Sequence, residues 1–199
     1  MVLSALLGLS AGAPTVTATQ YRFPLDDPYG EALTTLADGS VWVIHVDHDP
    51  EPSSLATLKC LVFDGREDFP DCYDGHKGTD YLLAGSFETM DAGSLLIVAA
   101  ADGLVVEVED DNYDRCHADA GSFNVTCDGF PMRSNRVSIE HADGTRTEYH
   151  HMKKGSALVA IDDVVACGQG LGLVGSSSIS SAHHLHFQVE LLDGQHDDP

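Results

Sequence analysis

The stretch Ala182-His183-His184-Leu185-His186-Phe187-Gln188-Val189-Glu190, near the end of the sequence, decides the fold and marks a candidate site on it. Successive side chains of a β-strand point to opposite faces, so His184 and His186 share one face while Leu185 and Phe187 occupy the other. The pattern predicts a strand with an apolar face in the core and two imidazoles together on the opposite face. Because a His-x-His pair also arises by chance, its meaning depends on residues further upstream.

The composition indicates a turn-rich globular protein with an acidic surface. The 199 residues suffice for one domain with a sizeable core, and 43% hydrophobic residues with 19 Gly and 8 Pro are ordinary for such a chain. Ten Lys and Arg stand against 32 Asp and Glu, which gives a formal net charge of -22. This balance argues against nucleic acid and against anionic membrane surfaces, since both require clustered cations. Saline surroundings would screen the self-repulsion.

The N-terminus carries a candidate export signal. Residues 1–13 combine an apolar run with Ala11-Gly12-Ala13, a small-x-small pattern typical of a signal-peptidase site, although no basic residue precedes the run. Nothing later approaches the length of about 20 apolar residues that spans a bilayer. We therefore expect a secreted chain with no membrane insertion after signal removal.

The five cysteines favour the same compartment. Cys60 with Cys72, and Cys116 with Cys127, flank short polar stretches of the kind that a disulfide stabilises, and Cys167 is left over. Five reduced thiols in a cytosolic protein are the alternative. The polar insertion from residue 110 to 132, which carries the second pair, could also narrow a groove or form a lid.

Short strands rich in β-branched and aromatic residues recur along the chain, and no helix of convincing period appears after residue 75. Residues 94–100 and 103–109 predict a hairpin in the core sheet. Further strands are expected at 21–25, 41–46, 158–166, 170–174 and 184–192.

A second hairpin is expected between residues 136 and 152, with its turn at Asp143-Gly144. A three-residue loop with a left-handed Gly144 pairs Ile139 with Thr147 and Val137 with Tyr149, which keeps apolar residues on one face. This register also places His151 on the Tyr149 face and points His150 away.

His76 and Asp80 form a second candidate pair, in Gly75-His76-Lys77-Gly78-Thr79-Asp80. A neutral imidazole and a carboxylate are both zinc donors, and Gly78 between them allows the backbone to bend so that they converge. A solvated loop histidine beside an unrelated acid is the alternative.

Taken in order, His76-x-x-x-Asp80, Thr147-x-Tyr149-x-His151 and His184-x-His186 resemble the lysostaphin-type (LytM-type) zinc metallopeptidases. The resemblance also includes Ile139-Glu140-His141-x-Asp143-Gly144 and covers roughly residues 74–190. It implies an all-β fold, a compact antiparallel sheet with long loops around a groove and little helix. Residues 72–192 would be the catalytic domain, preceded by a possible signal peptide (1–13) and an N-terminal extension or additional strands (14–71), and followed by a polar, frayed tail (193–199).

By the same resemblance, His76, Asp80 and His186 would hold Zn²⁺ and leave one coordination position open for water. His151 and His184 match the two non-ligand histidines of the family and would orient or deprotonate that water and stabilise the oxyanion. Tyr149 is a weaker candidate for contacting the substrate or the oxyanion.

The family cleaves peptide bonds in bacterial peptidoglycan, so the resemblance implies a zinc metalloendopeptidase acting on stem or cross-bridge peptides. We expect a monomer that is secreted, periplasmic or associated with the cell envelope. A non-catalytic LytM-like domain that binds or activates another wall hydrolase, and a zinc peptidase acting on proteins, are the alternatives. The sequence departs from the family pattern at Ala182-His183, commonly Gly-Pro, and at Gln188, usually Glu, and these positions bear on substrate choice more than on catalysis.

Overall fold

The computed structural model describes residues 17–26, 43–46, 72–73, 75–83, 87–92, 95–119 and 124–197. Within these ranges the protein is almost entirely β, with antiparallel sheets, which confirms the expected fold class. The expected signal peptide and most of residues 27–71 lie outside them. The elements are β1 (Leu25–Asp26), β2 (Val43–Val46), β3 (Thr79–Leu83), α1 (Phe87–Asp91), β4 (Leu96–Val98), β5 (Gly103–Glu109), β6 (His117–Ala118), β7 (Val125–Thr126), β8 (Arg136–Glu140), β9 (Arg146–His150), β10 (Val164–Val165), β11 (Gly170–Leu173), β12 (His184–Glu190) and β13 (His196–Asp197).

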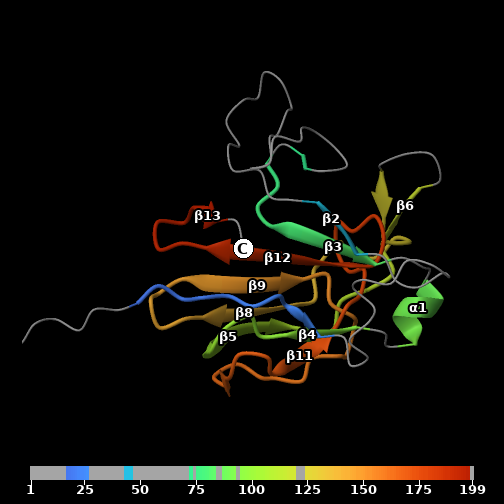
Figure 1. Cartoon of the computed structure of the whole chain (residues 1–199). Helices are drawn as coiled ribbons and strands as arrows, with labels where there is room; N and C mark the ends of the chain where they lie inside the picture. Colours follow the sequence, from blue (N-terminus) through green and yellow to red (C-terminus); the bar gives the residue numbers. More distant parts are fainter. Residues whose placement is uncertain are drawn as a thin grey trace, which may run out of the picture.

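Two sheets enclose the core (Figure 1). The larger sheet has the order β10-β5-β8-β9-β12-β3-β2, with β13 paired to β12, and the smaller has the order β1-β4-β11. Buried residues of both sheets form one cluster, in which Ile97 and Leu171 of the small sheet meet Val137, Tyr149 and Phe187 of the large one. Burial of these apolar faces joins the two layers.

The register of the β8–β9 hairpin is the one that the sequence predicts. Val137 lies opposite Tyr149 and Ile139 opposite Thr147, and Gly144 has a positive φ of 84°. The side chains of all four paired residues are completely buried. The strand alternation read from the sequence therefore sets this part of the sheet correctly.

The predicted hairpin of residues 94–109 is wrong. β4 belongs to the small sheet, between β1 and β11, whereas β5 belongs to the large sheet, between β10 and β8. The chain changes sheet at the buried Ala99, Ala100 and Ala101, whose small side chains let the two layers meet there. Two consecutive apolar strands fit a two-layer core as well as they fit one hairpin, so the sequence does not separate these arrangements.

Three other expectations also need correction. The helix α1, of five residues, was not expected after residue 75. The predicted strand 158–166 shrinks to β10, which pairs with β5 at the edge of the large sheet. The tail does not fray throughout, because His196 and Asp197 pair with Glu190 and Val189.

No helix of the described residues is long and apolar enough to cross a membrane.

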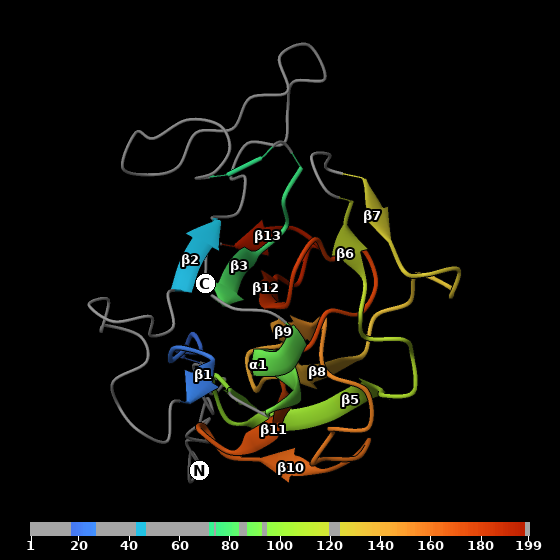
Figure 2. The ribbon, with the colours of Figure 1, turned by 90° about the vertical axis from the view of Figure 1, so that its right-hand side faces the viewer.

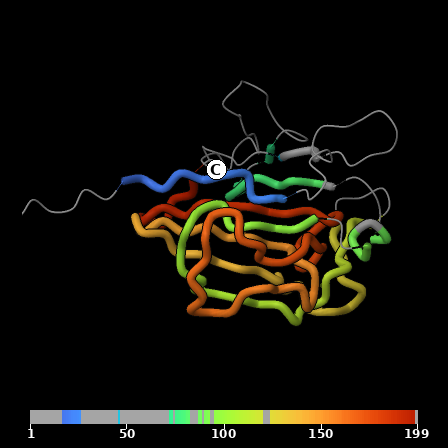
Figure 3. Tube along the Cα trace, turned by 60° about the horizontal axis from the view of Figure 1, so that its bottom comes forward, coloured from blue at the N-terminus to red at the C-terminus, as the bar shows by residue number. Residues whose placement is uncertain are grey.

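Residues 17–26 run lengthwise beside the strands (Figure 3). The Thr19 N–H donates to Asp143 at 2.6 Å, and the Tyr21 hydroxyl lies 2.6 Å from the Thr145 hydroxyl, so this segment is held to the β8–β9 turn. At its other end Leu25 pairs with Ile97.

The disulfide predicted between Cys116 and Cys127 is present, which argues against five reduced thiols. Cys72 is also disulfide-bonded, and its expected partner Cys60 lies outside the described residues. Cys167 is free, as expected, and it is exposed.

Candidate metal centre

Three side chains converge where β3 and β12 lie side by side. His76 Nε2, Asp80 Oδ1 and His186 Nδ1 each lie within 3.1 Å of the other two, the shortest separation being 2.7 Å between Asp80 and His186. The pairing of β3 with β12 sets Asp80 directly opposite His186, and His76 approaches from the segment that leads into β3. Two neutral nitrogens and one carboxylate oxygen, all facing one point, are a donor set for a divalent metal.

Gly78 permits this convergence through close packing rather than through an unusual backbone angle. A Cβ at this position would lie 2.3 Å from the Phe187 carbonyl oxygen and 2.7 Å from the Gln188 Cβ. Gly78 is not among the glycines with positive φ. The sequence analysis identified the right glycine but gave backbone bending as the reason. Gly78 is needed because it lets the segment between His76 and Asp80 lie directly against β12.

Gln188 fixes the orientation of the His186 ring. Its side-chain nitrogen donates to Glu148 Oε2 at 2.9 Å, and its side-chain oxygen lies 3.1 Å from His186 Nε2. A carboxylate only accepts, so Glu148 decides which end of the amide faces His186. His186 must then carry its hydrogen on Nε2, which leaves the Nδ1 lone pair directed at His76 and Asp80. In the sequence Gln188 stands out only as a departure from the family pattern, because its contact with Glu148 depends on the β9–β12 pairing.

His151 and His184 lie beside the three donors. Their ring centroids are 4.5 Å apart, and His184 Nε2 is 3.5 Å from Asp80 Oδ1. His151 Nδ1 lies 2.6 Å from the Ser177 carbonyl oxygen, and His184 Nδ1 lies 2.7 Å from the Ala182 carbonyl oxygen. Carbonyl oxygens only accept, so both rings carry a hydrogen on Nδ1, and His184 Nε2 faces Asp80.

The prediction that His150 points away from the Tyr149 face is confirmed, whereas the prediction that His151 lies on the Tyr149 face is wrong. His150 pairs with His186 across β9 and β12, and their ring centroids are 5.6 Å apart, so His150 lies on the face of the donor cluster. Strand alternation alone would put His151 on the core side, but β9 ends at His150 and His151 adopts a positive φ of 61°. This backbone turn brings His151 to the same side as His184. Alternation gave the side of His150, and the pairing of β9 with β12 sets His186 as its neighbour.

Burial and hydrogen bonding set the charge states of the cluster. Burial alone would raise the pKa of the Asp80 carboxyl, but the neighbouring charge of His184 and the close contacts with His184, His186 and His76 hold this pKa well below its usual value. Burial, together with the neighbouring histidines, lowers the pKa of His151 well below its usual value. A hydrogen bond from His150 lowers the pKa of Glu148. An ionised carboxylate and a neutral imidazole are the forms suited to a ligand and to a proton acceptor.

Zinc fits these residues. Zinc bonds to nitrogen and oxygen of about 2.0–2.2 Å put neighbouring donors of a tetrahedron roughly 3.3 Å apart, close to the separations in the cluster. The His186 tautomer, fixed by Gln188, presents a lone pair rather than a hydrogen to that point. His76 is 3% and Asp80 8% exposed, so ordering them costs little when a metal binds.

Tyr149 is not at the site. Its side chain is completely buried, and its hydroxyl accepts the Ala100 N–H at 2.7 Å. This geometry supports its role in core packing. Two nearby cations are engaged in other contacts, since Arg136 pairs with Glu107 and Lys153 Nζ donates to the Met90 carbonyl.

The chain is similar to several proteins of known structure. Among solved structures, the catalytic domain of the antimicrobial peptidase lysostaphin from Staphylococcus simulans is 26% identical, with a TM-score of 0.42 over 63% of this chain and 77% of that one. A variant of the catalytic domain of the prophage-encoded M23 protein EnpA from Enterococcus faecalis is 25% identical, with a TM-score of 0.43 over 78% and 88%. A chain of the SpoIIQ–SpoIIIAH pore-forming complex is 21% identical, with a TM-score of 0.51 over 92% and 90%, which shows a shared fold.

No curated protein sequence matches the chain. The sequence model of Peptidase family M23 matches residues 74–199, which include all the residues of the donor cluster and both neighbouring histidines. More than half of the chain is covered by this match. The chain therefore belongs to Peptidase family M23.

Proposed function

We propose that the protein is a zinc-dependent metalloendopeptidase that hydrolyses peptide bonds in the stems or cross-bridges of bacterial peptidoglycan. The observation that carries the proposal is the convergence of His76, Asp80 and His186 beside His151 and His184, whose Nδ1 atoms are held by backbone carbonyls. Membership of Peptidase family M23 supports the reaction class, and the similarity to lysostaphin supports the substrate class.

His76, Asp80 and His186 would be the ligands, and zinc bound there supplies Lewis acidity that brings the pKa of water to about 7. His151 and His184 would serve the proton transfers. With Nδ1 held by a backbone carbonyl, a neutral ring can accept a proton from the attacking water at Nε2 and return it to the leaving amine. The protonated form can instead donate from Nε2 to the developing oxyanion. Water is thereby added across the C–N bond, with oxygen on carbon and hydrogen on nitrogen.

The proposed setting is outside the cytoplasm, in the periplasm, in the cell envelope or in the medium, with the protein acting as a monomer. The disulfide between Cys116 and Cys127 supports an oxidising compartment. The net charge of -22 makes an anionic polymer an unfavourable partner at low salt, so we expect activity to rise with ionic strength.

The decisive experiment measures zinc content and fragment release on the same preparations. Purified peptidoglycans of different cross-bridge type are digested and the fragments are identified by mass spectrometry, which names the bond. We expect about one zinc per chain in the parent. His186→Ala should lose the metal, whereas His151→Ala and His184→Ala should keep it and lose about 10²–10⁴-fold in turnover. His117→Gln, on β6, is the matched control.

The alternatives predict other results. A binding or activator domain would release no fragments from any peptidoglycan but would stimulate a second wall hydrolase. A peptidase of secreted proteins would cleave an unfolded protein substrate and leave every peptidoglycan intact. Turnover at the parent rate in both His151→Ala and His184→Ala would refute the roles given to these residues.

A further inference from the structure

We propose that the disulfide-closed insertion between β5 and β8 braces the two non-ligand histidines, and that Ser176 and Ser180 are positioning residues which transmit this brace to His184. The inference rests on the proposed function, because it assigns His151 and His184 a task that depends on their placement. It concerns the loop of residues 174–183 between β11 and β12, here called the serine loop.

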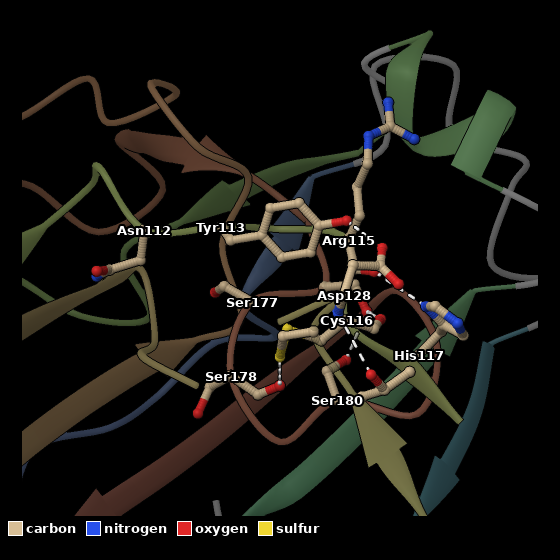
Figure 4. The surroundings of a disulfide bond; sticks show 12 residues. Asn112, Tyr113, Arg115, Cys116, His117, Asp128, Ser177, Ser178 and Ser180 are labelled. Carbon is tan, nitrogen blue, oxygen red and sulfur yellow. Dashed lines mark hydrogen bonds between the residues drawn. A yellow bond between two sulfur atoms is a disulfide. The ribbon is translucent and has the colours of Figure 1, made fainter. Parts of the chain in front are cut away.

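The insertion is bonded directly to the serine loop. The Cys116 N–H donates to the Ser176 carbonyl at 2.8 Å, and the Ser176 hydroxyl donates to the Cys116 carbonyl at 2.6 Å. The Ala118 N–H donates to the Ser181 carbonyl at 2.9 Å. Across the disulfide, Cys127 Sγ lies 3.4 Å from the Ser178 carbonyl oxygen. Figure 4 shows Ser177, Ser178 and Ser180 gathered around the Cys116–Cys127 bond.

From this anchor a buried chain of hydroxyl groups leads to His184. Ser176 Oγ lies 2.8 Å from Ser180 Oγ, and Ser180 Oγ lies 3.1 Å from His184 Nδ1. Ser176 and Ser180 are completely buried, as is Cys116, so these polar contacts are made away from solvent. The Ser180 hydroxyl also donates at 2.6 Å to the Ala182 carbonyl that accepts from His184, so this buried network favours one geometry.

The same loop also holds His151. The Ser177 carbonyl accepts the His151 Nδ1–H, and the Ser177 hydroxyl accepts the Asn135 N–H at 2.9 Å. His151 has a positive φ, a conformation that a non-glycine residue keeps only where its surroundings enforce it. The Ser134 hydroxyl accepts the His151 backbone N–H at 3.1 Å and also helps to hold this conformation.

The serine loop needs a brace because it has little regular structure of its own. It carries the chain from β11 in the small sheet to β12 in the large sheet, with Ser178 at a positive φ of 68° and Ile179 largely exposed. On one side stand the disulfide and β6, seen beside β12 in Figure 2, and on the other side stand the two histidines. The insertion, which the sequence suggested could narrow a groove or form a lid, contacts the serine loop through Cys116, Ala118 and Cys127.

The test separates placement of the histidines from metal binding. In Cys116→Ser/Cys127→Ser we expect kcat to fall about 100-fold, the loss typical of a misplacement of about 1 Å. KM and the zinc Kd should stay within about twofold of the parent. The reason is that His76, Asp80 and His186 are held by contacts other than those with the disulfide or the serine loop. Ser176→Ala and Ser180→Ala should each lose about tenfold in kcat. Cys167→Ser and Ser181→Ala, both at exposed positions, are the matched controls.

A second readout does not require turnover. Imidazole nitrogen NMR spectra of the zinc-loaded parent should show His151 and His184 each with a single tautomer protonated at Nδ1. In Cys116→Ser/Cys127→Ser these two rings should broaden or populate both tautomers, while the signals of His76 and His186 stay unchanged.

The outcomes distinguish the inference from the proposed function. Parent-like kcat in both serine variants, or unchanged His151 and His184 signals in the double variant, would overturn the brace while leaving the enzyme intact. A parent that cleaves no peptidoglycan, combined with altered ring signals in the double variant, would support the brace and refute the function. Ser176→Ala and Ser180→Ala keep the disulfide, so they test the brace even if Cys116→Ser/Cys127→Ser does not fold.

Discussion

Replacing Gln188 by leucine tests how the fold holds the His186 ligand. The Gln188 side chain is 8% exposed and links two groups, Glu148 at 2.9 Å and His186 Nε2 at 3.1 Å. Leucine has a similar volume but offers no acceptor, so the His186 Nε2–H loses its partner. The ring can then turn or exchange its tautomer, so nothing keeps the Nδ1 lone pair directed at His76 and Asp80.

The size of the effect follows from these contacts. One neutral hydrogen bond contributes about 0.5–1.5 kcal/mol, and a buried N–H without an acceptor costs about 1–3 kcal/mol. The metal-free variant bears part of this cost too, because its His186 ring is free to move. We therefore expect the free energy of zinc binding to weaken by about 1.4–2.7 kcal/mol. That corresponds to a zinc Kd about 10- to 100-fold weaker, the usual result of removing a group that orients a metal ligand.

The assay is competition for zinc against a chromogenic chelator, followed by absorbance at neutral pH. Gln195→Leu, at an exposed position in the turn before β13, is the matched control. Gln188→Glu restores the residue usual in lysostaphin-type peptidases, yet it should also weaken zinc binding, because Glu148 would then face a second carboxylate. The exchange Gln188→Glu/Glu148→Gln should recover the parent affinity. An unchanged Kd in Gln188→Leu would refute the reasoning.

The remaining predictions concern packing and pH. Gly78→Ala should weaken zinc binding and lower the melting temperature together, since the added Cβ would lie 2.3 Å from the Phe187 carbonyl oxygen and push β3 from β12; thermal scans with and without zinc check this. Tyr149→Phe should destabilise the fold by about 1–3 kcal/mol through the unsatisfied Ala100 N–H and leave kcat unchanged, which denaturant unfolding and turnover measure. Although burial opposes it, hydrogen bonds from Thr145 and from the Thr19 N–H hold the pKa of Asp143 well below its usual value. This folded-state pKa is depressed, so the stabilisation is present above about pH 4 and is lost as the pH falls further. Asp143→Asn should therefore flatten the acid limb of stability, by no more than about 1 kcal/mol for this partly exposed group, in unfolding curves compared at pH 7 and pH 3.

The departure at Gln188 shows why a sequence pattern alone can mislead. Compared with a family pattern, Gln188 looks like a loosened position with consequences for substrate choice. In the structure it is the residue that Glu148 requires, because an amide can donate to one carboxylate and accept from one imidazole at the same time. The pairing of β9 with β12, which aligns Glu148 with Gln188, decides its role.

Sequence by itself determined the elements whose period is strong. Alternation along Val137, Ile139, Thr147 and Tyr149 predicted the β8–β9 register, and alternation along His184, Leu185, His186 and Phe187 predicted which side of β12 faces the cluster. These predictions succeed because strand periodicity is a local property, set by the backbone and by which face is buried.

Only the tertiary structure decided the rest. It placed β4 and β5 in different sheets, set His150 opposite His186 and turned His151 toward His184 at a positive φ. It also brought the insertion against the serine loop, 50 to 60 residues apart in sequence, through the contacts of Cys116 and Cys127. These outcomes depend on which strands meet and on where each strand ends, and contacts across the sheet fix both.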